Sequence, residues 1–180
     1  MIENPKIIES VSVLFIYKQQ IFAVQRQPYL LAFPGYHAFP GGKVDNDESS
    51  TPFKTKILCD HDPRRMRAIC REVLEELDYD IEKGILNDEV FSVNELAETV
   101  APVFAPFRFR TWFYRIDLKN RVHFKADSGE FVSSFWSTPE KIIDDFREGK
   151  SLIVPPTRWI LKRLVEDPHA KKLGNLSEVF

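Results

Sequence analysis

The 180-residue chain has little cysteine, little net charge and no long apolar run, and each of these absences excludes a class of function. The two cysteines, Cys59 and Cys70, do not have the spacing of a zinc site, so we expect reduced thiols. A net charge of −2 gives no overall attraction for nucleic acid or an anionic membrane. No stretch reaches the roughly 18 apolar residues of a membrane span, and no basic, then apolar, leader opens the chain. We therefore expect a cytoplasmic protein with no nucleic-acid or membrane partner.

Residues 1–180 are expected to form a single domain, because 43% of the chain is hydrophobic and neither a repeat nor a linker divides it. The β-branched and aromatic runs at 7–18 and 21–27 predict a hairpin. Two similar runs at 107–117 and 131–136 predict further strands. The sequence therefore provides at least four strands.

Capping residues and prolines predict the helices. The expected ranges are 62–77, 93–99, 138–149 and 156–167. Ser92 and Glu95 support the second helix as a capping box. Residues 43–61 are polar and without periodicity, so we expect an exposed loop. Deleting part of it between Ser50 and His61 is expected to change substrate affinity more than stability. Strands and helices at irregular spacing favour an α/β or α+β sandwich over a repeating βαβ series.

Three glutamates crowd the helix at 62–77. Glu72, Glu75 and Glu76 occupy an arc of roughly 100° on a helical wheel, away from the apolar face. That face is expected to comprise Met66, Ile69, Cys70, Val73, Leu74 and Leu77. A solvated acidic stripe is the commoner interpretation of such a run. Because the three charges repel one another, the alternative is that a cation lies among them.

A longer pattern surrounds these glutamates. Gly42 is followed by five residues and Glu48, and the run Arg-Glu-Val-Leu-Glu-Glu follows at 71–76. This resembles the box of the Nudix hydrolases, and the resemblance implies an α/β fold, a Nudix-type α/β/α sandwich with a mixed sheet. The chain departs from the box in two places. A 15-residue insertion, at about 49–61, lengthens the spacing, and Asp78 replaces a closing glycine that would lie in the left-handed region, which Asp tolerates.

The resemblance also implies a Mg²⁺ site, with Mn²⁺ as the alternative ion, because hard cations bind diphosphates jointly with carboxylates. The implied ligands are the Gly41 carbonyl, Glu72, Glu75, Glu76 and Glu130. For Glu130 a simple turn residue is the alternative. Arg71 and Glu48 are expected to form an ion pair that fixes the loop to the helix, against the alternative of an exposed pair of little energetic value.

A second resemblance concerns the substrate. Arg26 and the run Gly-Tyr-His-Ala-Phe-Pro-Gly-Gly at 35–42 resemble the coenzyme A diphosphatase branch, in its peroxisomal-type subgroup, although Leu31 stands where that motif has Arg. Arg108 and Arg110 share one face of their expected strand and are candidates to bind phosphate, as are Arg26 and Gly42. Edge-strand solubility is the alternative for the two strand arginines.

The resemblance implies that the protein hydrolyses a diphosphate bond in a nucleoside diphosphate derivative. The expected partner is therefore a small-molecule substrate. Coenzyme A or an acyl-coenzyme A is the first candidate substrate. The alternatives are an ADP-ribose or nucleotide-sugar diphosphatase and a non-catalytic binding module with the Nudix fold. The oligomeric state and the identity of the catalytic base stay open at this point.

Overall fold

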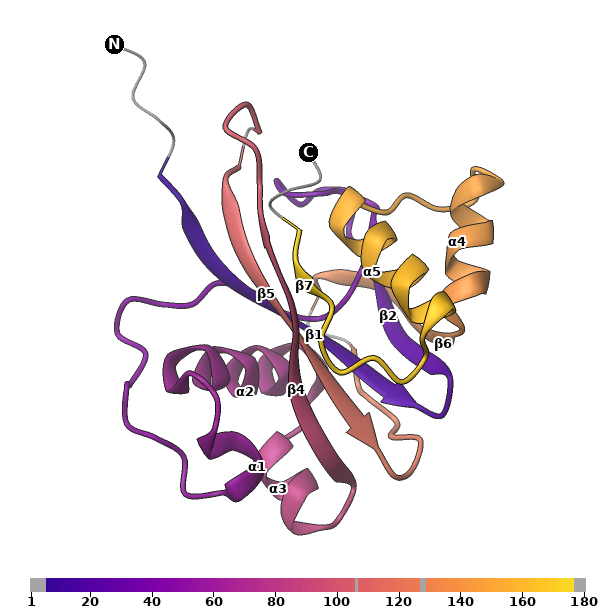
Figure 1. Cartoon of the computed structure of the whole chain (residues 1–180). Coiled ribbons are helices and arrows are strands. Elements are labelled where there is room, and N and C mark those ends of the chain that lie inside the picture. The colour runs from indigo at the N-terminus through magenta and orange to yellow at the C-terminus, as the bar shows by residue number, and fades with distance from the viewer. Residues whose placement is uncertain (1–5, 106, 127–128, 177–180) are drawn as a thin grey trace.

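A mixed sheet lies between two layers of helices in the computed structural model, which describes residues 6–105, 107–126 and 129–176 (Figure 1). The elements in chain order are β1 (Ile8–Tyr17), β2 (Gln20–Arg26), β3 (His37–Ala38), α1 (Lys56–Cys59), α2 (Pro63–Leu77), α3 (Ile81–Leu86), β4 (Val90–Val100), β5 (Phe109–Leu118), β6 (Phe131–Ser137), α4 (Pro139–Arg147), α5 (Pro155–Glu166) and β7 (Gly174–Asn175). None of the helices described is long and apolar enough to cross a membrane.

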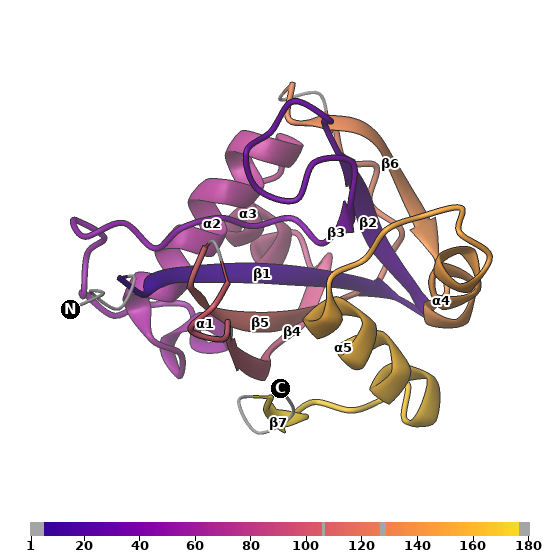
Figure 2. The same ribbon diagram turned by 90° about the horizontal axis from the view of Figure 1, so that it is seen from above.

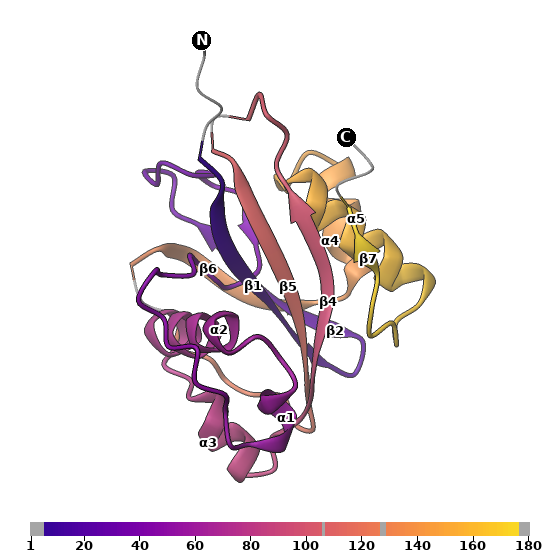
Figure 3. The same ribbon diagram turned by 60° about the vertical axis from the view of Figure 1, so that its left-hand side comes forward.

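The sheet has seven strands in the order β3-β2-β1-β5-β4-β7, with β6 paired to β2. β1 runs antiparallel to β2 and parallel to β5, which makes the sheet mixed. Helices α1 to α3 cover one face and α4 and α5 cover the other (Figure 3). Alternation along β1 explains this arrangement, since Val13 and Phe15 pack in the α2 cluster while Leu14 and Ile16 pack in the α4–α5 cluster. The expected α/β/α sandwich is confirmed.

Helix α2 begins and ends where its capping residues indicate. The Asp62 side chain accepts a hydrogen bond from the Arg65 amide at 3.0 Å, and Pro63 is the first helical residue. Asp78 closes the helix in the left-handed region at φ 51°, as expected for the residue that replaces the closing glycine. The apolar face is shifted from the expected one: Leu74 is 49% exposed, whereas Glu76 is buried. The helix is therefore rotated so that Glu76 points into the protein.

The helix expected at 93–99 is wrong, because these residues belong to β4. Ser92 does not cap a helix; its hydroxyl donates to Asp117 on β5 at 2.6 Å. Glu95 likewise accepts from the Tyr114 hydroxyl across the same strand pair at 3.1 Å. Both polar groups that suggested a capping box are instead satisfied between strands. Pairing along the whole of β5 outweighs the local preference.

The expectation of an exposed loop at 43–61 is also wrong for part of that segment. Phe53 is 7% exposed and Leu58 is fully buried in the cluster beneath α2. The Arg67 guanidinium lies 4.5 Å from the centroid of the Phe53 ring and donates to the Thr51 carbonyl at 3.1 Å. With Val44, which is 8% exposed in the same cluster, these apolar residues are too few in the polar stretch to show a period, but they suffice to anchor it.

We expect Leu58→Ala to destabilise the protein by about 2–5 kcal/mol, because it removes a fully buried side chain and leaves a cavity under α2. Chemical denaturation measures the effect. Lys56→Ala, an exposed change in the same helix α1, is the matched control and should alter the free energy of unfolding little. Equal stabilities of the two variants would show that the insertion is not part of the core.

Candidate functional site

The site forms where β1 and β2 separate. The two strands pair at Ile16 with Ile21 and at Tyr17 with Gln20, beside their hairpin turn. Further along β1, the Val13 amide donates to the Pro40 carbonyl at 2.8 Å and the Val11 amide donates to the Gly42 carbonyl at 2.9 Å. The segment at 40–42 thus lies alongside β1, and Figure 2 shows this region from above. Of its three carbonyls, that of Gly41 is the one not bonded to β1.

Two glycines are required here for different reasons. Gly41 has φ 145°, and a Cβ on it would lie 2.2 Å from the Val11 carbonyl oxygen. A Cβ on Gly42 would lie 2.1 Å from Oε1 of Glu72. Gly41 therefore lets the segment approach β1, and Gly42 leaves room for a carboxylate from α2.

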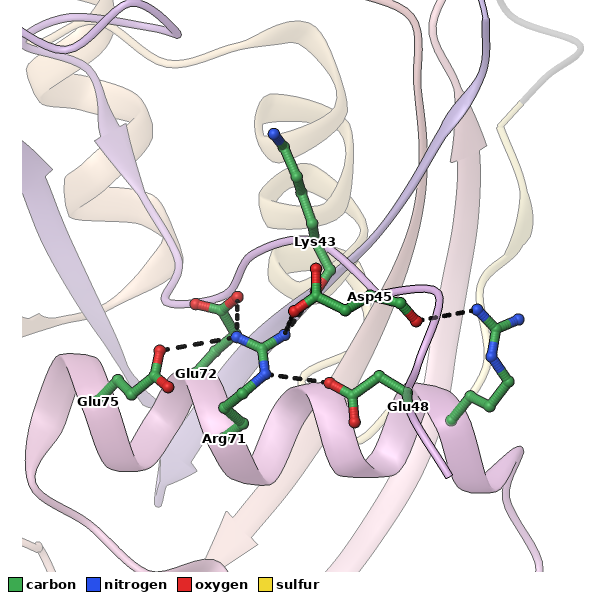
Figure 4. Close-up of polar contacts among 7 residues, drawn as sticks. Lys43, Asp45, Glu48, Arg71, Glu72 and Glu75 are labelled. Atoms are coloured by element: carbon green, nitrogen blue, oxygen red, sulfur yellow. Dashed lines mark hydrogen bonds and ion pairs between the residues drawn. The ribbon is translucent and has the colours of Figure 1, made fainter. Parts of the chain in front are cut away.

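A guanidinium, rather than a vacant space, lies among several of the acidic side chains. Arg71 contacts Glu48 at 3.0 Å, Glu72 at 2.8 Å and Glu75 at 3.6 Å (Figure 4). It also contacts Asp45 at 3.2 Å. The predicted pair of Arg71 with Glu48 is present, and the Glu48 side chain is only 11% exposed. Arg71 thus fixes the loop that follows Gly42 to α2, and it offsets part of the repulsion between the glutamates.

The cleft beside this network has a volume of about 360 Å³ and is lined by Glu72, Glu76 and Glu130. Glu76 comes from α2 and accepts a hydrogen bond from the Gly41 amide at 2.9 Å. Glu130 comes from the segment just before β6. Glu75 does not line the cleft; its side chain is 61% exposed and lies toward Arg71. Of the four predicted carboxylates, the structure therefore brings three to one cavity.

Burial shifts the pKa values of two of these carboxyl groups upward. Burial raises the pKa of Glu76 to about 8, opposed by the Gly41 amide and reinforced by Glu72 and Glu130. Burial also raises the pKa of Glu72, against the opposing effect of Arg71. Repulsion from Glu130 acts on both groups. The cleft therefore holds partly desolvated carboxylates in mutual repulsion, which a cation would relieve.

The side chains of the cleft carry donor atoms of the type that a divalent cation binds, although they are not arranged around one common point. Within the described part of the chain, no group of three or more His, Cys, Asp or Glu side chains is arranged to hold a metal ion. Glu72 is held by Arg71 and Glu76 by the Gly41 amide. The donor set nevertheless consists of oxygen atoms, as Mg²⁺ and Mn²⁺ prefer. The Gly41 carbonyl, which accepts no backbone hydrogen bond within the described part of the chain, is a further oxygen on the segment that contacts Glu76.

Of the three arginines predicted to bind phosphate, only one lines the cleft. Arg26 lines the cleft, and its Nε donates to the Ala32 carbonyl at 3.1 Å. Arg110 lies outside the cleft and is paired with Glu98 at 2.5 Å. With Lys43 it lines a neighbouring cavity of about 510 Å³. Arg108 lines neither cavity, and its Nε is buried without a partner among the described residues.

Two residues of the site that follow Gly42, Lys43 and Asp45, were not predicted from the sequence. Asp45 pairs with Arg71, and the Lys43 carbonyl accepts from the same guanidinium at 2.9 Å. The Lys43 side chain lines both the cleft and the neighbouring cavity, and it points away from the carboxylates in Figure 4. Both residues lie between Gly42 and Glu48, inside the box, and this position could have identified them as candidates for the site.

The raised pKa of Glu76 predicts a pH dependence of stability in the absence of divalent cations. Its value rises from 4.5 to about 8 on folding, so the folded protein holds a proton that the unfolded chain releases within this window. Stability from this group is fully present below pH 4.5 and is lost as pH rises toward 8, at about 1.4 kcal/mol per pKa unit.

Denaturation of the metal-free protein at several pH values measures this loss, and Glu76→Gln is the reference. The free energy of unfolding of the parent should fall relative to that of the variant, by a few kcal/mol, between pH 5 and 8. The same slope in both proteins would contradict the assignment of the buried proton to Glu76.

Comparisons with known proteins agree with this geometry at the level of the fold. No family model matches the chain, and no curated protein matches it. A NUDIX hydrolase from Alicyclobacillus acidocaldarius is similar in structure with a TM-score of 0.72 and 20% identity, over 92% of this chain and 94% of that one. A NUDIX hydrolase from Nitrosomonas europaea has a TM-score of 0.60 and 16% identity, over 98% and 81%. The dihydroneopterin triphosphate pyrophosphohydrolase of E. coli has a TM-score of 0.59 and 14% identity, over 88% and 95%. The chain therefore has the fold of the Nudix hydrolases.

Proposed function

We propose that this protein is a divalent-cation-dependent hydrolase that cleaves a diphosphate bond in a nucleoside diphosphate derivative. The observation that carries the proposal is the pair of half-buried Glu72 and buried Glu76, which lie against Gly42 and Gly41 and share one open cleft with Glu130. A non-catalytic binding module would have little use for two partly desolvated carboxylates that repel each other and a third, Glu130, in the same cleft. The fold shared with Nudix hydrolases supports the same conclusion.

Each part of the site has a role in this reaction. A bound Mg²⁺ would neutralise the diphosphate and stabilise the developing charge. Glu72, Glu76 and the Gly41 carbonyl would hold the ion, and Glu75 would join them only after leaving Arg71. The proton of the attacking water would pass to a carboxylate that lines the cleft. Arg71 and Glu48 keep α2 in register with the Gly41–Gly42 segment, so they position ligands without touching substrate.

Coenzyme A or an acyl-coenzyme A is our first candidate substrate. The support is the motif at 35–42, of which residues 36–39, 41 and 42 line the cleft, together with Arg26. The cavity beside Lys43 and Arg110 could accept a further phosphate group, since a basic side chain of each lines it. Arg110 would exchange Glu98 for that phosphate.

A substrate comparison tests the proposal. Purified protein is incubated with coenzyme A, its 3′-dephospho form and ADP-ribose, with Mg²⁺ or with a chelator, and the products are identified by mass spectrometry. We expect Mg²⁺-dependent release of 3′,5′-ADP and phosphopantetheine, with a higher kcat/KM for coenzyme A than for ADP-ribose. A preference for ADP-ribose would overturn the coenzyme A assignment and keep the diphosphatase chemistry. Absence of hydrolysis across the set would contradict the proposed function.

A further inference from the structure

A second cavity, of about 330 Å³, adjoins the carboxylate cleft. Five residues line both: Phe33, Phe109, Thr111, Phe113 and Val154. They come from the segment between β2 and β3, from β5 and from the residue before α5. Because the walls are shared, one small molecule can occupy the two cavities at once.

The lining of this second cavity, hereafter the apolar annex, offers almost no hydrogen bonds. Among the described residues that line it, the polar side chains are those of Thr99 and Thr111. Thr99 is 4% exposed, and the Thr111 hydroxyl is already paired with the Ser10 hydroxyl at 2.7 Å. The other lining residues are apolar, including five phenylalanines and three prolines. A polar group buried in the annex would therefore lose its water without gaining a partner.

Phe33 stands at the junction of the two cavities in an unfavourable backbone conformation. Its φ is 51°, in the left-handed region that bulky residues rarely adopt. Its ring lies 6.0 Å from that of Tyr36, edge to face, and both residues line the cleft. Backbone strain of this kind concentrates at ligand clamps. The strained backbone conformation thus occurs at the residue whose aromatic side chain lies between the polar and the apolar cavity.

Several apolar side chains on the outer wall of the annex are exposed to solvent. Phe104 is 85% exposed and Phe107 is 39% exposed, both on the segment between β4 and β5. Phe33, on the opposite segment, is 43% exposed. Covering these rings with an apolar group would be favourable, at about 25 cal/mol per Å² of apolar surface removed from water.

We infer that the apolar annex binds an aliphatic chain that is joined covalently to the diphosphate held in the cleft. This inference rests on the proposed function for the position of the diphosphate. A nucleobase is the other apolar group that a diphosphate derivative carries. Its ring nitrogens and exocyclic groups need hydrogen-bond partners, and the annex does not provide them. An aliphatic chain has no such groups, so it matches the lining along its whole length.

Binding of a homologous series tests this inference without turnover. The probes are the ethyl, butyl and octyl esters of methylenediphosphonate, which lack a cleavable P–O–P bond, and titration calorimetry with Mg²⁺ gives each Kd. We expect affinity to rise about threefold for each added methylene until the chain outgrows the annex. Phe104→Ser should weaken binding of the octyl ester by about fivefold and leave the ethyl ester unchanged. Val103→Ser, an exposed neighbour that does not line the annex, is the matched control and should bind all three esters as the parent does.

The outcomes separate this inference from the proposed function. Equal affinity for the three esters, or an equal effect of the Phe104 and Val103 changes, would overturn the annex as a chain-binding site, even in a protein that hydrolyses diphosphates. A chain-length dependence abolished by Phe104→Ser would support it. If that dependence appeared while no diphosphate was hydrolysed in the substrate comparison, the annex would stand and the proposed function would fall.

Discussion

Replacing Glu76 by Gln is expected to lower kcat by about 100-fold or more. The change removes one charge from the cluster that would hold the cation, so the ion can no longer stabilise the developing charge as well. The fold should survive, because Gln has the same shape and its carbonyl oxygen can still accept the hydrogen bond from the Gly41 amide. Steady-state kinetics at saturating Mg²⁺ measure the loss, and thermal denaturation checks the fold.

Glu140→Gln provides the matched control for that experiment, because Glu140 is an exposed carboxylate on α4 that does not line the cleft. It should keep the parent rate. If Glu76→Gln retained more than half of the parent rate, the interpretation of the carboxylate cluster as a cation site would be abandoned.

Gly42→Ala is expected to lower kcat/KM by about 100-fold while changing the melting temperature little. The new Cβ would lie 2.1 Å from the Glu72 carboxylate, which must move away. A carboxylate at the end of a flexible side chain can move without disturbing the backbone, so the loss falls on the site rather than on the fold. Parallel measurements of kcat/KM and melting temperature separate the two effects.

Gly149→Ala serves as the control, because we expect it to change stability and not activity. Gly149 follows α4 with φ 71° and open space around it, so a side chain there is strained but collides with nothing. It should cost about 1 kcal/mol of stability and leave activity unchanged. A Gly42→Ala variant that unfolded, or that kept its activity, would contradict the role given to the Gly42–Glu72 contact.

The sequence predicted those parts of the fold that depend on local chemistry. Asp62 and Pro63 fix the start of α2, and the tolerance of Asp for the left-handed region explains its end at Asp78. The hairpin of β1 and β2 followed from β-branched and aromatic runs. The ion pair of Arg71 with Glu48 followed from the resemblance to the Nudix box. The caps and the hairpin need no knowledge of distant contacts, whereas the ion pair joins residues 23 positions apart and was available only through the resemblance.

Features that depend on distant contacts were not predictable from the sequence. Residues 93–99 form part of β4 because β5 pairs with them, which no local pattern reveals. Glu76 is buried because the segment at 40–42 covers it, 35 residues earlier in the chain. The same contact decides which carboxylates share the cleft. A helical wheel places Glu75 and Glu76 at the two ends of one arc of roughly 100°, and of these two only Glu76 reaches the cavity.

The position of a bound cation tests the proposed carboxylate site most directly. Crystals soaked with Mn²⁺ and a non-cleavable diphosphate should show an anomalous-scattering peak in the cleft, with oxygens of Glu76 and Glu72 at about 2.1–2.2 Å. The Gly41 carbonyl should also lie within bonding distance of this peak. No peak in the cleft, or a peak held only by exposed carboxylates away from Glu76, would contradict the proposed site.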